Sequence, residues 1–144
     1  MNRYIGILRR CELHFIREEL GKYGLQTLEG RLLSVLTEEC TSQEVLCCQL
    51  NLDKGQIAKS ISALEEKGLV IRRINEKNRR QKLVSLTDRG REMVGIMEGI
   101  YKSWDTISYQ GFTPEEIQLY RDFIKRMAEN AMEYKRKNGG YING

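Results

Sequence analysis

The sequence predicts a mainly α-helical domain with one small β-hairpin. The chain has 144 residues, 40% of them hydrophobic, so it is long enough to bury a single core. It has one Pro and mostly isolated Gly residues, which leaves long stretches that favour helices over a many-stranded sheet. Two short apolar runs between residues 69 and 86 predict the hairpin. We expect one domain over residues 1–144.

Two amphipathic helices are expected to begin the chain. Apolar residues recur at roughly helical spacing between residues 3 and 20, and Gly21 and Gly24 should end this first helix. A second helix is expected over residues 28–38, with Thr27 as its N-cap. The apolar faces of the two helices should pack together as core.

A short helix and a longer helix should then meet across about three residues. The segment TSQE is a capping box in which Thr41 would accept a hydrogen bond from the amide of Glu44. This short helix should end near Leu50, and Asp53 should cap the next one. Gly68 stands where the glycine after a helix belongs.

The helix after Asp53 has two different faces. One face is apolar and the other is polar and basic, with the apolar set Ile57, Ala58, Ile61 and Leu64 and the polar set Lys54, Gln56, Lys59 and Ser60. A short helix, a tight turn and a second helix with a free basic face are typical of a helix-turn-helix, whose second helix enters the major groove of DNA. Helix pairs of this kind also occur in plain bundles.

The apolar runs 69–71 and 83–86 predict two β-strands around a six-residue loop, 75–80. Between Arg72 and Lys82 there are six Lys or Arg residues and one Glu, a density that would repel itself without an anionic partner. Such a hairpin is a basic wing, and its Arg residues can reach the narrow minor groove. Residues 53–91 as a whole hold 11 Lys or Arg against 5 Asp or Glu, the electrostatic footprint of a polyanion partner. An ordinary solvated surface is the alternative.

Two longer helices should end the chain. Thr87 would cap a helix over residues 88–109, and Thr113 opens a further capping box with Pro114 as the first helical residue. The final helix has an apolar seam with 3-4-3-4-3 spacing, which requires a partner helix, at Ile117, Tyr120, Ile124, Met127, Ala131 and Tyr134. Residues 138–144, NGGYING, should form a disordered tail.

These parts together resemble the MarR family of winged helix-turn-helix transcription factors. The resemblance covers almost the whole chain and is most specific in LEEKGLVIRR, NRRQKLVSLT and LTDRG, after a recognition helix of the form LDKGQIAKSISAL. It implies a homodimer in which helices from residues 1–24 and 89–137 interlock, with a DNA-binding part over residues 28–88. Such a dimer would place two recognition helices on a pseudo-palindromic operator in double-stranded DNA, with half-sites about 10 bp apart.

The resemblance also assigns roles to individual residues. Four of them match the family's major-groove positions, namely Lys54, Gln56, Lys59 and Ser60. Arg80 matches the wing arginine that enters the minor groove, and Lys77 and Arg79 would contact phosphates. The family usually has Asp where this chain has Asn78, and an amide holds a guanidinium less strongly than a carboxylate does. The wing is therefore expected to be looser, unless Glu76 substitutes.

Two kinds of effector follow from the resemblance. Family members commonly release DNA on binding a small aromatic or amphipathic molecule, and Met97, Tyr101 and Trp104 are candidates to line its pocket, with ordinary core packing as the alternative. Gly95 and Gly99 would admit a ligand or a close helix crossing. Other members sense oxidants through a thiolate, for which Cys11, beside two Arg residues, is the candidate.

Other classes of protein are less consistent with the sequence. His14 is the single histidine and the Cys spacing matches no zinc pattern, so we expect no metal site. No catalytic constellation or phosphate loop is present, so we expect neither an enzyme nor a cofactor. No apolar run approaches the ~18 residues of a membrane span, and we expect a cytoplasmic protein. We expect a DNA-binding repressor released by an effector; a winged-helix protein-interaction module without DNA binding is the alternative.

Overall fold

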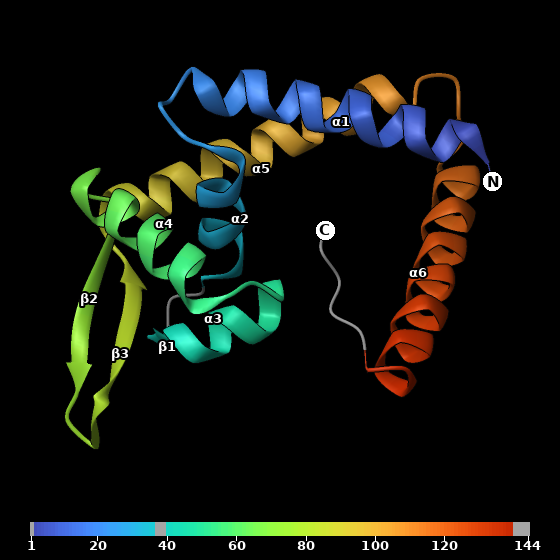
Figure 1. Ribbon diagram of the computed structural model, residues 1–144. Coiled ribbons are helices and arrows are strands. Elements are labelled where there is room, and N and C mark those ends of the chain that lie inside the picture. Colours follow the sequence, from blue (N-terminus) through green and yellow to red (C-terminus); the bar gives the residue numbers. More distant parts are fainter. Residues whose placement is uncertain (1, 37–39, 140–144) are drawn as a thin grey trace. The chain divides into compact units, whose positions relative to one another are not determined.

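The computed structural model describes residues 2–36 and 40–139, and it has the expected mainly helical fold with a small antiparallel sheet (Figure 1). The chain divides into two compact units, the first ending at Trp104 and the second beginning at Asp105. The elements in chain order are α1 (Arg3–Gly21), α2 (Thr27–Val35), β1 (Thr41–Ser42), α3 (Gln43–Leu50), α4 (Lys54–Glu66), β2 (Val70–Asn75), β3 (Asn78–Leu86), α5 (Asp88–Ser108) and α6 (Pro114–Lys137).

The core of the first unit joins α1 to the helix-turn-helix and the base of the sheet. The C-terminal half of α1 contributes Ile16 and Leu20, which confirms the predicted packing of the first two helices. The least exposed large side chains come from seven elements and are Leu20, Leu32, Leu33, Leu46, Ile57, Ile61, Leu64, Val70, Val84 and Met97. This core fixes the direction in which each polar face points.

The second helix begins one residue earlier than predicted. Gln26 is the N-cap, and its backbone amide donates to Oε2 of Glu29 at 3.0 Å, so the prediction of Thr27 as N-cap is wrong. The predicted C-terminal boundary is also wrong, because the helix ends at Val35 and Leu36 is already extended. The rest of the predicted helix, residues 37 and 38, lies outside the described residues. Spacing alone could not show that Glu29 reaches back to position 26.

The short helix α3 is capped by Ser42, and the prediction of Thr41 is wrong. The Oγ of Ser42 accepts from the amide of Val45 at 3.2 Å. Thr41 and Ser42 instead form strand β1, which pairs with Val84 and Leu83. The sheet therefore has three strands in the order β1-β3-β2. An N-cap residue has extended backbone, and here the preceding residue is extended as well and adds a strand to the free edge of β3.

The hairpin strands are longer than predicted, and the predicted six-residue loop is wrong. β2 runs to Asn75 and β3 begins at Asn78, which leaves only Glu76 and Lys77 between them. The Asn75 side chain accepts from the amide of Lys77 at 3.1 Å and donates to Gln81 at 2.7 Å. Apart from Ile74, the outer half of the hairpin is polar on both faces, so the sequence there lacks the alternation of apolar and polar residues that predicts a strand.

The last two helices agree with their predicted caps. α5 covers Asp88–Ser108, one residue shorter than predicted, and α6 begins with the predicted capping box at Thr113. No residue of α6 is buried in the single chain, although the helix has a broad set of exposed large apolar side chains, Leu119, Tyr120, Phe123, Ile124, Met127, Met132 and Tyr134. Of the predicted tail, residues 140–144 lie outside the described residues. None of the described helices has the length and hydropathy to span a membrane.

Candidate nucleic-acid interface

The turn between α3 and α4 has the predicted three-residue length, Asn51 to Asp53. Asn51 adopts a left-handed conformation with φ 54°, and the amide of Leu52 donates to the carbonyl of Cys47 at 3.2 Å. Asp53 is the N-cap of α4 as predicted, since its Oδ1 accepts from the amide of Gln56 at 2.9 Å. The two helices therefore form a helix-turn-helix with a fixed crossing.

The α4 helix presents its polar face to solvent because its apolar face is fully buried. Ile57, Ile61 and Leu64 each have 0% exposure. This orientation determines the exposure of the four residues predicted for the major groove: Lys54, Gln56 and Lys59 are exposed and Ser60 is half-buried. The structure thus brings all four to the N-terminal half of one helix, the half that contacts base edges in helix-turn-helix proteins.

The wing carries the three other predicted DNA contacts on the exposed end of the hairpin. Lys77, Arg79 and Arg80 are exposed, and in residues 2–36 and 40–139 no hydrogen bond or ion pair holds any of their charged groups. Asn78 accepts from the backbone amide of Arg80 at 3.3 Å. The amide side chain therefore shapes the turn backbone and leaves the guanidinium of Arg80 free to contact an anion.

One wing arginine is held by α4. Arg72 donates from Nη2 to Ser62 Oγ at 3.1 Å and to Glu65 Oε1 at 3.2 Å, and its backbone amide donates to Glu65 Oε2 at 3.0 Å. These hydrogen bonds lower the pKa of the Glu65 carboxyl. The prediction of a basic wing counted Arg72 among the free wing charges. The one sequence signal for its pairing is the opposite charge of Glu65, seven positions earlier.

A shallow hollow of about 260 Å³ lies beside this pair, lined by Glu65, Arg72, Arg73, Ile74 and Lys82. Arg73 and Lys82 are exposed basic residues on the two wing strands that sequence reasoning did not single out. Because Glu65 neutralises Arg72, these two are the cations that remain available on this part of the wing.

The C-terminal end of α4 is anchored by a pair that is distant in the sequence. Lys67 donates to Glu29 Oε2 at 2.6 Å and to the carbonyl oxygen of Gly24 at 2.7 Å. Glu29 is only 4% exposed, so this carboxylate is buried with its partner in place. The contact spans 38 positions, and the sequence offered no signal for it.

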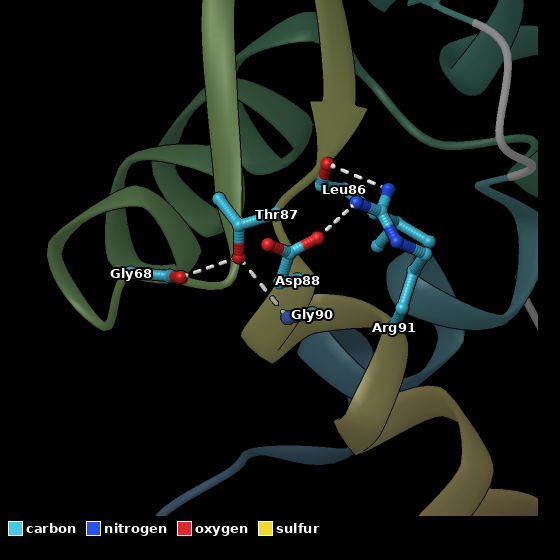
Figure 2. A network of polar contacts seen from close by, with 6 residues as sticks. All are labelled: Gly68, Leu86, Thr87, Asp88, Gly90 and Arg91. Carbon is cyan, nitrogen blue, oxygen red and sulfur yellow. Dashed lines mark hydrogen bonds and ion pairs between the residues drawn. The ribbon is translucent and has the colours of Figure 1, made fainter.

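The start of α5 closes the base of the wing (Figure 2). Thr87 Oγ1 donates to the carbonyl of Gly68 at 2.6 Å and accepts from the amide of Gly90 at 3.0 Å, which confirms Thr87 as the predicted cap. Arg91 pairs with Asp88 and donates to the carbonyl of Leu86. The LTDRG motif thus ties the end of α4, the end of β3 and the start of α5 together.

The candidate effector residues lie on the part of α5 that belongs to the first unit. Met97 is 1% exposed in the core and Tyr101 packs partly against it. Trp104 stacks at a tilt on Phe15 with 5.6 Å between ring centroids. An added Cβ at Gly95 or Gly99 would meet nothing within 4 Å, so neither glycine is needed for a close crossing within this chain.

The four cysteines differ in exposure. Cys11, Cys40 and Cys48 are exposed, whereas Cys47 is half-buried against the core. Burial raises the pKa of the Cys47 thiol, because an apolar environment disfavours the thiolate. In the part of the chain that the structure describes, no three His, Cys, Asp or Glu residues are grouped to hold a metal ion.

A family description of a winged helix DNA-binding domain matches residues 25–90, which include the helix-turn-helix, the wing and the LTDRG motif. The solved structure of MarR is similar to this chain over 95% of its length and 94% of MarR, with 29% identity and a TM-score of 0.82. A MarR transcriptional regulator from Methanosarcina mazei Go1 shares 28% identity, covers 92% of this chain and 96% of its own, and has a TM-score of 0.83.

This chain is similar to MarR-type transcriptional regulators. A further MarR-type structure, from Listeria monocytogenes and complexed with a 26mer DNA, has a TM-score of 0.81. It covers 100% of this chain and 98% of its own at 24% identity, so it shows the common fold alone. The MarR resemblance expected from the sequence motifs is thereby confirmed. The chain contains a winged helix DNA-binding domain over residues 25–90 and is similar in fold to MarR over 95% of its length.

Proposed function

We propose that this MarR-type regulator binds double-stranded DNA sequence-specifically as a homodimer and represses transcription until an effector releases it. The supporting observation is the arrangement of its free charges. Lys54, Gln56 and Lys59 project from α4 because the opposite face is buried. The wing cations Lys77, Arg79 and Arg80, which have no ion pair with any other described residue, extend from the adjacent sheet. Cations without carboxylate partners at a helix and a wing are suited to phosphates and groove edges. The Listeria structure with bound DNA adds support by analogy.

The contacts divide into two classes. Gln56 can pair with adenine and Lys54 or Lys59 with guanine in the major groove, and Ser60 can contact a base or the backbone. Arg80 would enter the minor groove, with Lys77 and Arg79 on phosphates. Residues 28–88 are the proposed DNA-binding part.

The homodimer is supported by apolar surface that the single chain leaves uncovered. On α6, Phe123 and Met127 are 53% and 55% exposed, and on α1 Tyr4 and Ile5 are 65% and 51% exposed. Such surface is rarely left open in a monomer and is typical of an interface. We assign residues 1–24 and 89–137 to dimerisation, with two α4 helices about 10 bp apart on a pseudo-palindromic operator in the cytoplasm.

Effector control requires a molecule that prefers the dimer arrangement unable to bind DNA, since equal affinity for both arrangements would change nothing. A small aromatic or amphipathic ligand beside Met97, Tyr101 and Trp104 is our first proposal. Oxidation of Cys11, which is exposed, is the second. Peroxide treatment of wild type and Cys11→Ser separates them: release that is equal in both, or absent from both, excludes Cys11 as the sensor.

Fluorescence anisotropy with duplex fragments selected from the source genome tests the central proposal. We expect affinity to fall steeply with salt, because each neutralised phosphate releases counterions, and a selected duplex to bind more tightly than an unrelated one. Absence of salt-dependent binding would overturn the proposal in favour of a winged-helix module that binds proteins.

A further inference from the structure

We propose that Glu65 and Arg72 are positioning residues that hold the wing at a fixed angle to the recognition helix. Neither is assigned a DNA contact. Together they would make α4 and the hairpin move as one unit, so that base contacts and wing contacts form in the same register. This inference rests on the proposed DNA-binding function and deepens it.

The geometry at the wing root supports this role. Glu65 lies in the last turn of α4, and its two carboxylate oxygens accept from the backbone and the side chain of Arg72, at 3.0 and 3.2 Å. The same Nη2 donates to Ser62, one turn earlier on α4, at 3.1 Å. One wing residue is thus held at three points by one helix. Charge-assisted bonds of this kind are stronger and more directional than neutral ones.

The hairpin needs such a tether because it has little other support. β2 is an edge strand in the order β1-β3-β2, and β1 pairs only with Leu83 and Val84. Beyond Arg73 the wing is a two-stranded ribbon, and an isolated hairpin is marginally stable in water. The Glu65 carboxylate accepts a hydrogen bond from the backbone amide of Arg72, on the edge strand β2. It therefore fixes this strand close to the point where the ribbon leaves the core.

Simple electrostatics and positioning predict opposite effects of removing Glu65. Loss of a negative charge near DNA should tighten binding if charge alone matters, whereas loss of a tether should weaken it. Glu66 provides a matched control. It is the next residue on α4, is exposed, and has no hydrogen bond or ion pair within the part of the chain that the structure describes.

The experiment compares Glu65→Ala with Glu66→Ala in the full chain, by anisotropy on a labelled duplex selected from the source genome. We expect Glu65→Ala to bind about tenfold more weakly with an unchanged salt slope, since a charged hydrogen bond is lost but no phosphate contact is. Glu66→Ala should bind as wild type or slightly more tightly. Equal affinity of the two variants would overturn the inference.

A double-mutant cycle and an exchange measurement keep the test specific. Arg72→Ala should also weaken binding, and Glu65→Ala/Arg72→Ala should be no weaker than the single variants, because both remove one tether. Additive losses would overturn the pairing. Amide hydrogen exchange without DNA should be faster at Arg72 and the wing strands in Glu65→Ala than in wild type, and unchanged in Glu66→Ala. If exchange is unchanged in Glu65→Ala, the inference that Glu65 tethers the wing is wrong, even if the protein binds DNA. If exchange shows the tether but the chain binds no DNA, only the proposed DNA-binding function is wrong.

Discussion

The backbone of Gly90 on α5 lies so close to the carbonyl group of Leu69 that an added Cβ would overlap the oxygen atom and lie 3.1 Å from the carbonyl carbon. This approach lets Thr87 cap α5 and bond Gly68 at the same time (Figure 2). The glycine of LTDRG is therefore a packing requirement where α5 crosses the end of the recognition helix.

We expect Gly90→Ala to lower the free energy of unfolding by about 2–3 kcal/mol, because a rigid backbone carbonyl must move to admit the methyl group. Urea denaturation at fixed protein concentration measures it. Gly95→Ala on the same helix meets open space and should raise stability by up to about 1 kcal/mol through helix propensity. The same response from both variants would show that the contact at Gly90 is unimportant.

Arg80→Ala should weaken binding to duplex DNA and lower the salt slope by about 1, since one cation near the phosphates is lost. Anisotropy over a salt titration provides both numbers. Arg17→Ala removes the same charge from an exposed position on α1 and should leave the slope unchanged. An unchanged slope in Arg80→Ala would remove this wing residue from the interface.

Met127→Glu should shift the protein from dimer to monomer and weaken self-association at least about tenfold, because an unpaired charge would be buried in the interface. Light scattering over a concentration series measures this. Gln118→Glu introduces the same residue nine positions earlier, which is the opposite side of α6, and should leave the dimer intact. A dimer unaffected by Met127→Glu would exclude this face of α6 from the interface.

Cys47 should react with iodoacetamide more slowly than Cys48 at neutral pH. Its pKa is raised by burial, so its thiolate fraction at a given pH is smaller and increases only as pH rises through that raised value. Mass spectrometry of peptides after brief labelling at several pH values provides both rates. Equally fast labelling of the two neighbours would show that the half-buried position of Cys47 does not protect it.

Local spacing predicted much of the fold. The caps Asp53 and Thr113 and the Gly68 terminator were confirmed, because each depends on hydrogen bonds within one helical turn. The orientation of α4 was also confirmed, because burial of its apolar face, Ile57, Ile61 and Leu64, directs Lys54 and Lys59 toward solvent. At Thr41 the prediction failed because pairing with a distant segment changed a local preference: Thr41 joins Val84 in β1.

By itself, the sequence determined that this chain is a winged helix-turn-helix with a basic, exposed face on its second helix, because periodicity and capping are short-range properties. Only the tertiary structure decided which charges are free. Arg72 and Arg80 are both wing arginines, yet the path of the chain places Glu65 and Ser62 against one and leaves the other open. Lys67 likewise meets the buried Glu29 across 38 positions. Contacts of this kind depend on where the core brings elements together, which local spacing does not encode.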